Sequence, residues 1–241
     1  MLELETSHAA SGPANLRPIH LRHDPCRPCL VGLRGLPSVR AAFLAVFLLV
    51  LMVMPGVAVD LDPDVVRVLE QLALPVPDPA NPIVCHGFGC AYRTPILLRN
   101  ADKAQIKKLF GPAAVKSAEE ERKALAATMA WFEKRVAGEA GTATAKARAG
   151  LGHAGDPSQF DCLDKTSNTV GVLMIVADMG LLRHHVIDVP ESRGFLIGGL
   201  PHTTAVVRER KGGLRWAIDG WTHANGELPD VLPLEQWRTQ S

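Results

Sequence analysis

One cysteine, one histidine and one aspartate in the second half of the chain have the types and order of a nucleophilic catalytic triad. Cys162 lies within 159–164, QFDCLD, where a predicted loop gives way to an apolar helix. Asp161 is a favourable N-cap, so Cys162 falls in the first helical turn, where free N–H groups and the helix dipole favour a thiolate. His202 and Asp219 lie on two predicted strands. We therefore expect Cys162 to act as nucleophile, His202 as general base and Asp219 as the residue that orients the base.

The predicted hairpin around 211–213 decides whether the histidine and the aspartate meet. Side chains on a strand alternate between its two faces. A hairpin loop with an even number of residues would place His202 and Asp219 on the same face. A two-residue loop at 211–212 would put His202 opposite Trp221 and make Asp219 its diagonal neighbour. A six-residue loop would set the two directly opposite, and an odd loop would separate them.

The neighbours of the cysteine leave its reactivity open. Asp161 and Asp164 are acids next to the thiol and would raise its pKa unless they point away. Gln159 and Asp161 are candidates for oxyanion stabilisation or for support of the site, Gln159 because its side chain could add a donor. The alternative interpretation is structural: Cys162 would be a small apolar residue at a helix start, because most buried cysteines are inert.

Other polar residues compete for roles in the same region. His184 and His185 adjoin a predicted strand and are interpreted as surface or core-edge histidines. His223 lies in a predicted turn and could line the cleft. Asn168 and Thr169, further along the helix that begins near the cysteine, are expected to cap or support the site.

The arrangement resembles the transglutaminase-like branch of the papain-like cysteine-peptidase superfamily, above all bacterial transglutaminase-like proteins of the cell envelope. Their cysteine often lies in a Gly-Asp-Cys-x-Asp context, and residues 160–164, FDCLD, match it at Asp, Cys and Asp but lack the glycine. The resemblance covers about 159–237. It implies that Cys162 is the nucleophile, His202 the general base and Asp219 its orienting partner. The residue after the histidine is threonine, where many relatives carry an aromatic one.

The chain after the predicted leader has an odd number of cysteines. The three cysteines after Ala58 are Cys85, Cys90 and Cys162. The four-residue spacer between Cys85 and Cys90 holds two glycines, so a tight turn could join the two sulfurs in an oxidising compartment. A metal site that also uses His86, a pair of free thiols and a redox-active pair are the alternatives. We expect a disulfide, and no metal or other cofactor.

An apolar stretch near the N-terminus predicts export. Residues 41–54 carry no polar side chain, Arg34 and Arg40 precede them, and 56–58 are small or apolar residues suited to a signal peptidase. We expect a signal peptide that is cleaved after residue 58. An uncleaved anchor over 41–59 and a buried core helix are the alternatives.

The first forty residues are long for a signal n-region. They are either a cytoplasmic tail on an anchor or a sign that the true start lies downstream. Cys26 and Cys29 lie in this segment, in a C-x-x-C spacing without the strand-to-helix context of a redox motif. We expect a leader over 1–58 and one transglutaminase-like domain over 59–241, periplasmic if the source is bacterial.

The composition fits a globular domain and argues against a nucleic-acid partner. The 241 residues include 26 basic and 25 acidic side chains, a formal net charge of +1, and 47% hydrophobic residues. Helical periodicity comes first and short strands follow, which predicts an α+β fold with a nucleophile helix packed on a C-terminal antiparallel sheet. Helices are expected over 62–73, 101–110, 117–137 and 161–183, and strands within 83–98 and over 185–189, 194–197, 203–208 and 214–218.

Two function classes follow. The first is an exported thiol enzyme that acts on an amide bond of a protein or peptide, by hydrolysis or by acyl transfer. The second is a catalytically silent domain of the same fold that binds an envelope protein or peptide, because a fold does not guarantee chemistry. A thiol–disulfide protein that uses Cys85 and Cys90 is a third interpretation, which the wide spacing disfavours.

Overall fold

The computed structural model describes residues 60–114, 116–194 and 201–240, all within one compact unit, Gly56–Ser241. The predicted signal peptide, its alternatives and the C-x-x-C pair lie outside the described residues. Among the helices that are described, none is long and apolar enough to cross a membrane.

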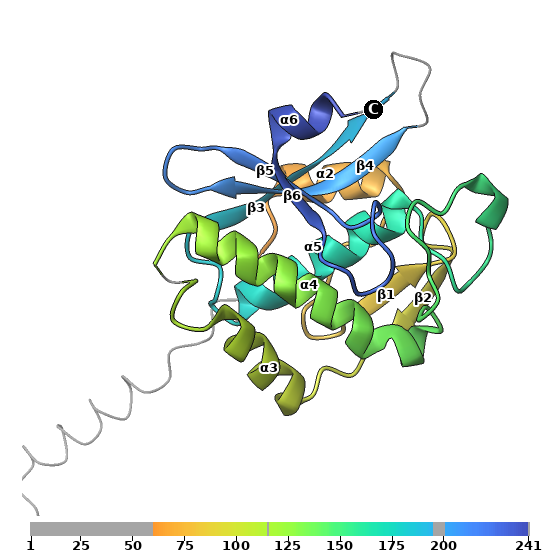
Figure 1. The fold of residues 1–241 in the computed structure, drawn as a ribbon, viewed down its shortest axis with the longest axis horizontal. Helices are drawn as coiled ribbons and strands as arrows, with labels where there is room; N and C mark the ends of the chain where they lie inside the picture. Colours follow the sequence, from red (N-terminus) through yellow and green to blue (C-terminus); the bar gives the residue numbers. More distant parts are fainter. Residues whose placement is uncertain (1–59, 115, 195–200, 241) are drawn as a thin grey trace, which may run out of the picture. The chain divides into compact units, whose positions relative to one another are not determined.

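The described chain combines helices with antiparallel sheets, as the α+β prediction requires (Figure 1). Its helices are α2 (Pro63–Gln71), α3 (Asn100–Phe110), α4 (Ala118–Ala140), the short 3-10 helix η1 (Leu151–His153), α5 (Cys162–Asp178) and α6 (Leu234–Arg238). Strands β1 (Ile83–His86) and β2 (Tyr92–Pro95) form a hairpin. Strands β3 (His185–Arg193), β4 (His202–Glu209), β5 (Arg215–Asp219) and β6 (Asp230–Pro233) form a four-stranded sheet in that order.

Helix α5 and helix α6 pack on opposite sides of the four-stranded sheet (Figure 1). Adjacent residues of β4 divide between the two sides because side chains alternate along a strand. Val207 joins the main core with Leu173 of α5, whereas Val206 packs with Leu234 and Trp237 of α6. The sheet therefore connects the helix that begins at Cys162 with a C-terminal helix that the sequence did not predict.

Local signals set most helix boundaries. The Ser117 hydroxyl accepts a hydrogen bond from Glu120 N, at 3.2 Å, and begins α4, which ends at Gly141 with a φ of 72°. Helix α5 begins after Asp161, as predicted. It ends at Asp178, before the predicted residue 183, because the chain turns at Gly180 with a φ of 67°.

Two strand predictions differ from the structure. Residues 185–193 form a single strand with a register shift between Asp188 and Glu191, around a proline that cannot donate to the ladder. Of the second strand predicted there, residues 195–197 lie outside the described residues. Strand β6 was not predicted because its four residues include a proline and show no clear alternation.

The β4–β5 hairpin has the register of an even loop. Ala205 pairs with Ile218, Arg208 pairs with Arg215, and Glu209 N donates to Leu214 O at 2.8 Å. This is the register predicted from a two-residue loop, so the start of β4 and the end of β5 converge at one end of the sheet.

Candidate functional site

His202 and Asp219 meet at the end of the β4–β5 hairpin. His202 Nε2 lies 2.5 Å from Asp219 Oδ2, and both side chains are buried. The imidazole lies between two indoles: its ring centroid is 4.7 Å from that of Trp221 and 5.5 Å from that of Trp237. The aspartate also accepts from Trp237 Nε1 at 2.8 Å and from Trp221 N at 3.1 Å. Packing and hydrogen bonds thus hold the histidine in one orientation.

The aspartate determines which nitrogen of the histidine is free. Burial raises the pKa of Asp219, but the hydrogen bonds from His202 and Trp237 outweigh it and hold this pKa below its usual value. The ionised carboxylate only accepts hydrogen bonds, so the proton of the neutral imidazole lies on Nε2. His202 Nδ1 is buried and has no hydrogen-bond partner in the described part of the chain. It is therefore a free lone pair that could accept a proton.

Cys162 is the first residue of α5 and the free cysteine of the described chain. Its Sγ lies 3.9 Å from the carbonyl oxygen of Pro201, the residue before the histidine. Burial, and then the charges of Asp161 and Asp219, raise the pKa of the Cys162 thiol to about 11, although the Thr203 amide lowers it. The resting cysteine is thus a neutral thiol.

The thiol and the histidine line the same pocket, which has a volume of about 330 Å³. Apart from these two residues its walls are mainly apolar, and they come from separate segments: Leu72, Phe88, Ala149, Gly150, Leu151, Leu163, Pro201 and Trp221, with Asp161 and Thr203. A nucleophile, a base and a cavity that opens on both are the three elements that acyl transfer requires.

The two acids beside the cysteine bind a backbone loop. Asp161 Oδ1 accepts from Asp164 N at 2.7 Å, and Asp164 Oδ2 accepts from Asp161 N at 3.1 Å, which is a reciprocal capping box. The two carboxylates also accept hydrogen bonds from three successive backbone amides. Gly89 N donates to Asp161, and Phe88 N and Cys90 N donate to Asp164, all within 2.8 Å. Burial and the charge of Asp161 raise the pKa of Asp164 to about 7.

That loop is closed by the predicted disulfide between Cys85 and Cys90, whose Cα atoms are 4.5 Å apart. Every residue from 87 to 90 has a positive φ, including the non-glycine residues Phe88 (75°) and Cys90 (59°). Such a backbone is unfavourable for side chains other than glycine and persists only where its surroundings hold it. The disulfide and the two carboxylates of α5 provide that restraint.

Helix α5 forms hydrogen bonds with the disulfide-closed segment at a second point. Asn168 accepts from Cys85 N at 2.7 Å and donates to Cys85 O at 2.8 Å, so it supports the region as predicted.

Both nitrogens of His86 are engaged, with Pro157 O at 2.6 Å and Thr94 Oγ1 at 2.8 Å. In the chain as described, no group of three or more His, Cys, Asp or Glu side chains could hold a metal ion.

The other candidates lie away from the pocket. Gln159 does not line it: Oε1 accepts from Lys146 N at 2.9 Å, and Nε2 donates to Ser158 Oγ at 3.1 Å, so the side chain supports a loop. His185 is buried against Glu121, with Nδ1 2.8 Å from Oε1. His184 N donates to the same carboxylate. His223 Nε2 lies 3.1 Å from Asp230 Oδ1, outside the pocket.

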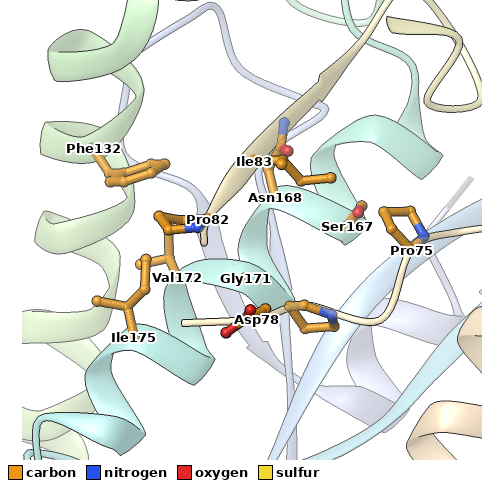
Figure 2. A pocket seen from close by; sticks show the side chains of 11 residues that line it. Pro75, Asp78, Pro82, Ile83, Phe132, Ser167, Asn168, Gly171, Val172 and Ile175 are labelled. Atoms are coloured by element: carbon orange, nitrogen blue, oxygen red, sulfur yellow. The ribbon is translucent and has the colours of Figure 1, made fainter. Parts of the chain in front are cut away.

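A second cavity on α5 has a different character. It lies between α4, the middle of α5 and residues 75–82, which include four prolines, and Phe132, Asn168 and Ile175 are among its lining residues (Figure 2). Its volume is about 20 Å³, enough for about one water molecule. The hydroxyl of Ser167 in its wall is engaged with Cys85 Sγ at 3.2 Å. This cavity is a packing defect too small for a substrate.

Sequence reasoning did not identify Trp237 as a site residue. Its indole donates a hydrogen bond to Asp219 and packs on His202. These two residues lie 18 and 35 positions before Trp237 in the sequence, so no local pattern links them to it. A buried tryptophan usually needs an acceptor for its N–H, and that rule was the available signal. It does not indicate which acceptor is used.

No family model, curated protein or solved structure matches this chain. The resemblance to transglutaminase-like proteins therefore rests on the residues of the sequence alone.

Proposed function

We propose that this domain has a papain- and transglutaminase-like core and is a thiol enzyme that acts on amide bonds, as a peptidase, amidase or acyl transferase. One observation carries the proposal. Asp219 holds one nitrogen of His202, and the other nitrogen is buried and has no partner among the described residues; His202 shares a pocket with Cys162. A purely structural histidine would be expected to have both nitrogens satisfied, as His86 has.

The chemistry follows from a thiol whose pKa is raised and a histidine nitrogen that Asp219 does not engage. Cys162 Sγ attacks the carbonyl carbon of the amide while His202 Nδ1 accepts the thiol proton, and Asp219 stabilises the resulting imidazolium. The backbone N–H of Cys162, at the first position of α5, has no acceptor within the helix and could donate to the oxyanion. The C–N bond then breaks, His202 returns its proton to the leaving amine, and an acyl group remains on Sγ.

The acyl group is then transferred to water or to an amine. Attack by water would make the protein a peptidase or amidase, and attack by an amine would make it an acyl transferase. The apolar walls of the pocket favour a substrate group that displaces water. We expect proteins or peptides as substrates because amide bonds join their residues.

A second function is favoured by the raised pKa of the thiol. A silent domain that binds an envelope protein or peptide in the same pocket would need no ionised cysteine. The two proposals differ in one measurable property, which is the effect of His202 on the reactivity of Cys162.

Export is part of the proposal. The disulfide between Cys85 and Cys90 supports it, because such bonds form and persist in oxidising compartments. Fractionation of cells that produce the full chain should recover the disulfide-bonded protein outside the cytoplasm, processed or membrane-anchored. Recovery of a reduced cytoplasmic protein would contradict this part.

The enzyme proposal is tested by the rate at which iodoacetamide alkylates Cys162 as a function of pH. In the wild type, we expect reaction at pH 7 with the help of His202. In His202→Ala the thiol must ionise without a base, and burial, which raises its pKa, delays the reaction to alkaline pH. We expect the rate at pH 7 to fall about a hundredfold.

Two further variants make the result specific. Asp219→Asn keeps a similar shape but removes the charge that stabilises the imidazolium, so we expect an intermediate loss. His223→Gln changes a partly exposed histidine outside the pocket and should leave the rate unchanged. If the rate were the same in the wild type and in His202→Ala, the enzyme proposal would be wrong and the binding domain would stand.

A further inference from the structure

The pocket beside Cys162 also indicates what kind of substrate the site accepts. This inference rests on the proposed function and adds a substrate class to it. We propose that the pocket binds a large apolar side chain on the acyl side of the scissile amide bond. The acyl side is indicated because the pocket is lined by Cys162, the residue to which the acyl group becomes attached.

Apolar side chains at the pocket remain open to solvent instead of joining the core. Leu151 is 70% exposed, and Leu72, Phe88, Leu163 and Trp221 are only partly buried. They come from the end of α2, the disulfide loop, the segment before α5, α5 itself and the segment after β5. Five separate segments thus contribute apolar surface to one small area, which is typical of a ligand site.

The described residues give the pocket no free charge to pair with a charged substrate. Asp161 is the only carboxylate among the described lining residues, and both of its oxygens are engaged: Oδ1 with Asp164 N at 2.7 Å and Oδ2 with Gly89 N at 2.8 Å. No lysine or arginine is among those lining residues. An acidic side chain would meet the charge of Asp161, and a basic one would lose its hydration without gaining a free partner.

The size of the pocket suits one large side chain and its adjoining backbone. Its volume of about 330 Å³ is at the lower end of the range for small-molecule sites, about 300–1,000 Å³. A glycine or alanine would leave most of this space unfilled. Leucine and phenylalanine would cover the exposed faces of Leu151, Leu163 and Phe88.

The experiment uses peptidyl chloromethyl ketones on the purified protein. The reagents share one blocked dipeptide and differ only in the residue next to the ketone, which is Leu, Phe, Gly, Lys or Glu. The second-order rate of Cys162 modification is measured by mass spectrometry and divided by the iodoacetamide rate of the same protein. We expect the Leu and Phe reagents to react at least about tenfold faster than the other three, because they bury an additional large apolar side chain.

A matched pair of variants locates the preference. Leu151→Asp places a charge in the pocket at a position exposed enough to tolerate it, so the normalised Leu and Phe rates should fall and the Lys rate should rise. Leu97→Asp makes the same change at a leucine of similar exposure, 68%, outside the pocket, and should retain the wild-type preference.

The outcomes separate this inference from the proposed function. If iodoacetamide alkylation depends on His202 but the five reagents react alike, or the Gly, Lys or Glu reagent is fastest, the substrate class is wrong and the enzyme proposal stands. If alkylation does not depend on His202, the enzyme proposal fails and the inference fails with it. A preference for Leu and Phe that Leu151→Asp removes and Leu97→Asp retains would establish the apolar pocket.

Discussion

At the scale of single residues, hydrogen bonds decide which atoms of Asp219 and His202 carry protons. Asp219 Oδ2 accepts from both His202 and Trp237, and these bonds keep the carboxylate ionised despite its burial. Because the ionised carboxylate accepts from Nε2, the other nitrogen, Nδ1, is left for the proposed role of base. The role of His202 therefore depends on a tryptophan that has no chemistry of its own.

Trp237→Phe tests this dependence, because it keeps an aromatic ring in the core but removes the indole N–H. We expect the free energy of unfolding to fall by about 1–3 kcal/mol, since a buried carboxylate loses a donor. We also expect the pH profile of Cys162 alkylation to shift, because the pKa of Asp219 rises. Urea denaturation and the iodoacetamide assay measure the two effects.

Trp131→Phe is the matched control for that variant. Trp131 is partly buried and packs on Phe132, and its indole has no hydrogen bond to the described residues. This variant should show a smaller loss of stability and the wild-type pH profile. An unchanged profile in Trp237→Phe would reduce Trp237 to a packing residue.

At the scale of elements, the nucleophile helix and the disulfide loop stabilise each other. The loop supplies three amide donors to the first turn of α5, and α5 supplies the carboxylates that hold a strained backbone in place. Phe88, on this loop, is also a wall of the pocket. The shape of the substrate site thus depends on an element that carries none of the three proposed catalytic residues.

Replacing both cysteines of the loop, Cys85→Ser with Cys90→Ser, should loosen it. The two cysteines are five positions apart, and closing so short a loop stabilises the folded state by about 2 kcal/mol through the entropy of the unfolded chain. We expect a loss of that size in urea denaturation. The preference for apolar reagents should also weaken because Phe88 is less well held. Wild-type protein reduced with dithiothreitol should behave like the variant, and equal stability before and after reduction would contradict this account.

At the scale of the whole molecule, a buried glutamate ties the helical layer to the sheet. Glu121 of α4 accepts from Arg183 N at 2.7 Å, from His185 N at 3.0 Å and from the His185 ring at 2.8 Å. Arg122 extends the connection: it donates to Glu209 Oε1 at 2.6 Å and lies 3.6 Å from the Trp216 ring centroid. This cluster fixes the start of β3, the first strand of the sheet that carries His202 and Asp219.

Glu121→Gln should destabilise the whole domain, by about 3 kcal/mol, because an amide cannot accept from all these donors and leaves some of them unpaired. Burial raises the pKa of Glu121, but hydrogen bonds from His185 and from nearby amides hold it below its usual value. Its stabilisation is therefore present above about pH 4.3 and is lost as the pH falls through the lowered pKa. Urea denaturation between pH 3 and pH 8 should show a stronger pH dependence in the wild type than in the variant, in which Asp219 still contributes.

A matched control for that change lies on the same helix. Glu119→Gln alters an exposed glutamate that pairs with Lys123 across one helical turn, and such surface pairs contribute little to stability. We expect the free energy of unfolding to change little. Equal losses in the two variants would show that the buried cluster is not what connects α4 to the sheet.

The sequence by itself determined the features that depend on neighbours in the chain. The cap at Asp161, the position of Cys162 in the first turn and the expected disulfide across a glycine-containing spacer each arise within a few residues of the chain. The period of a strand showed that an even hairpin loop would place His202 and Asp219 on one face, but the sequence left the loop length open and the structure supplied it.

Only the tertiary structure decided which distant groups meet. Phe88 N and Asp164 are 76 positions apart, Glu121 and His185 64, and neither pairing leaves a pattern in the local sequence. Asp161 and Asp164 could equally have faced the thiol; they accept instead from three amides of the loop, of which that of Cys90 is buried and needs an acceptor. The same packing left His202 Nδ1 without a partner among the described residues and left apolar side chains open beside Cys162. Partners of this kind depend on which surfaces fold against each other, and that is set by burial of the whole core.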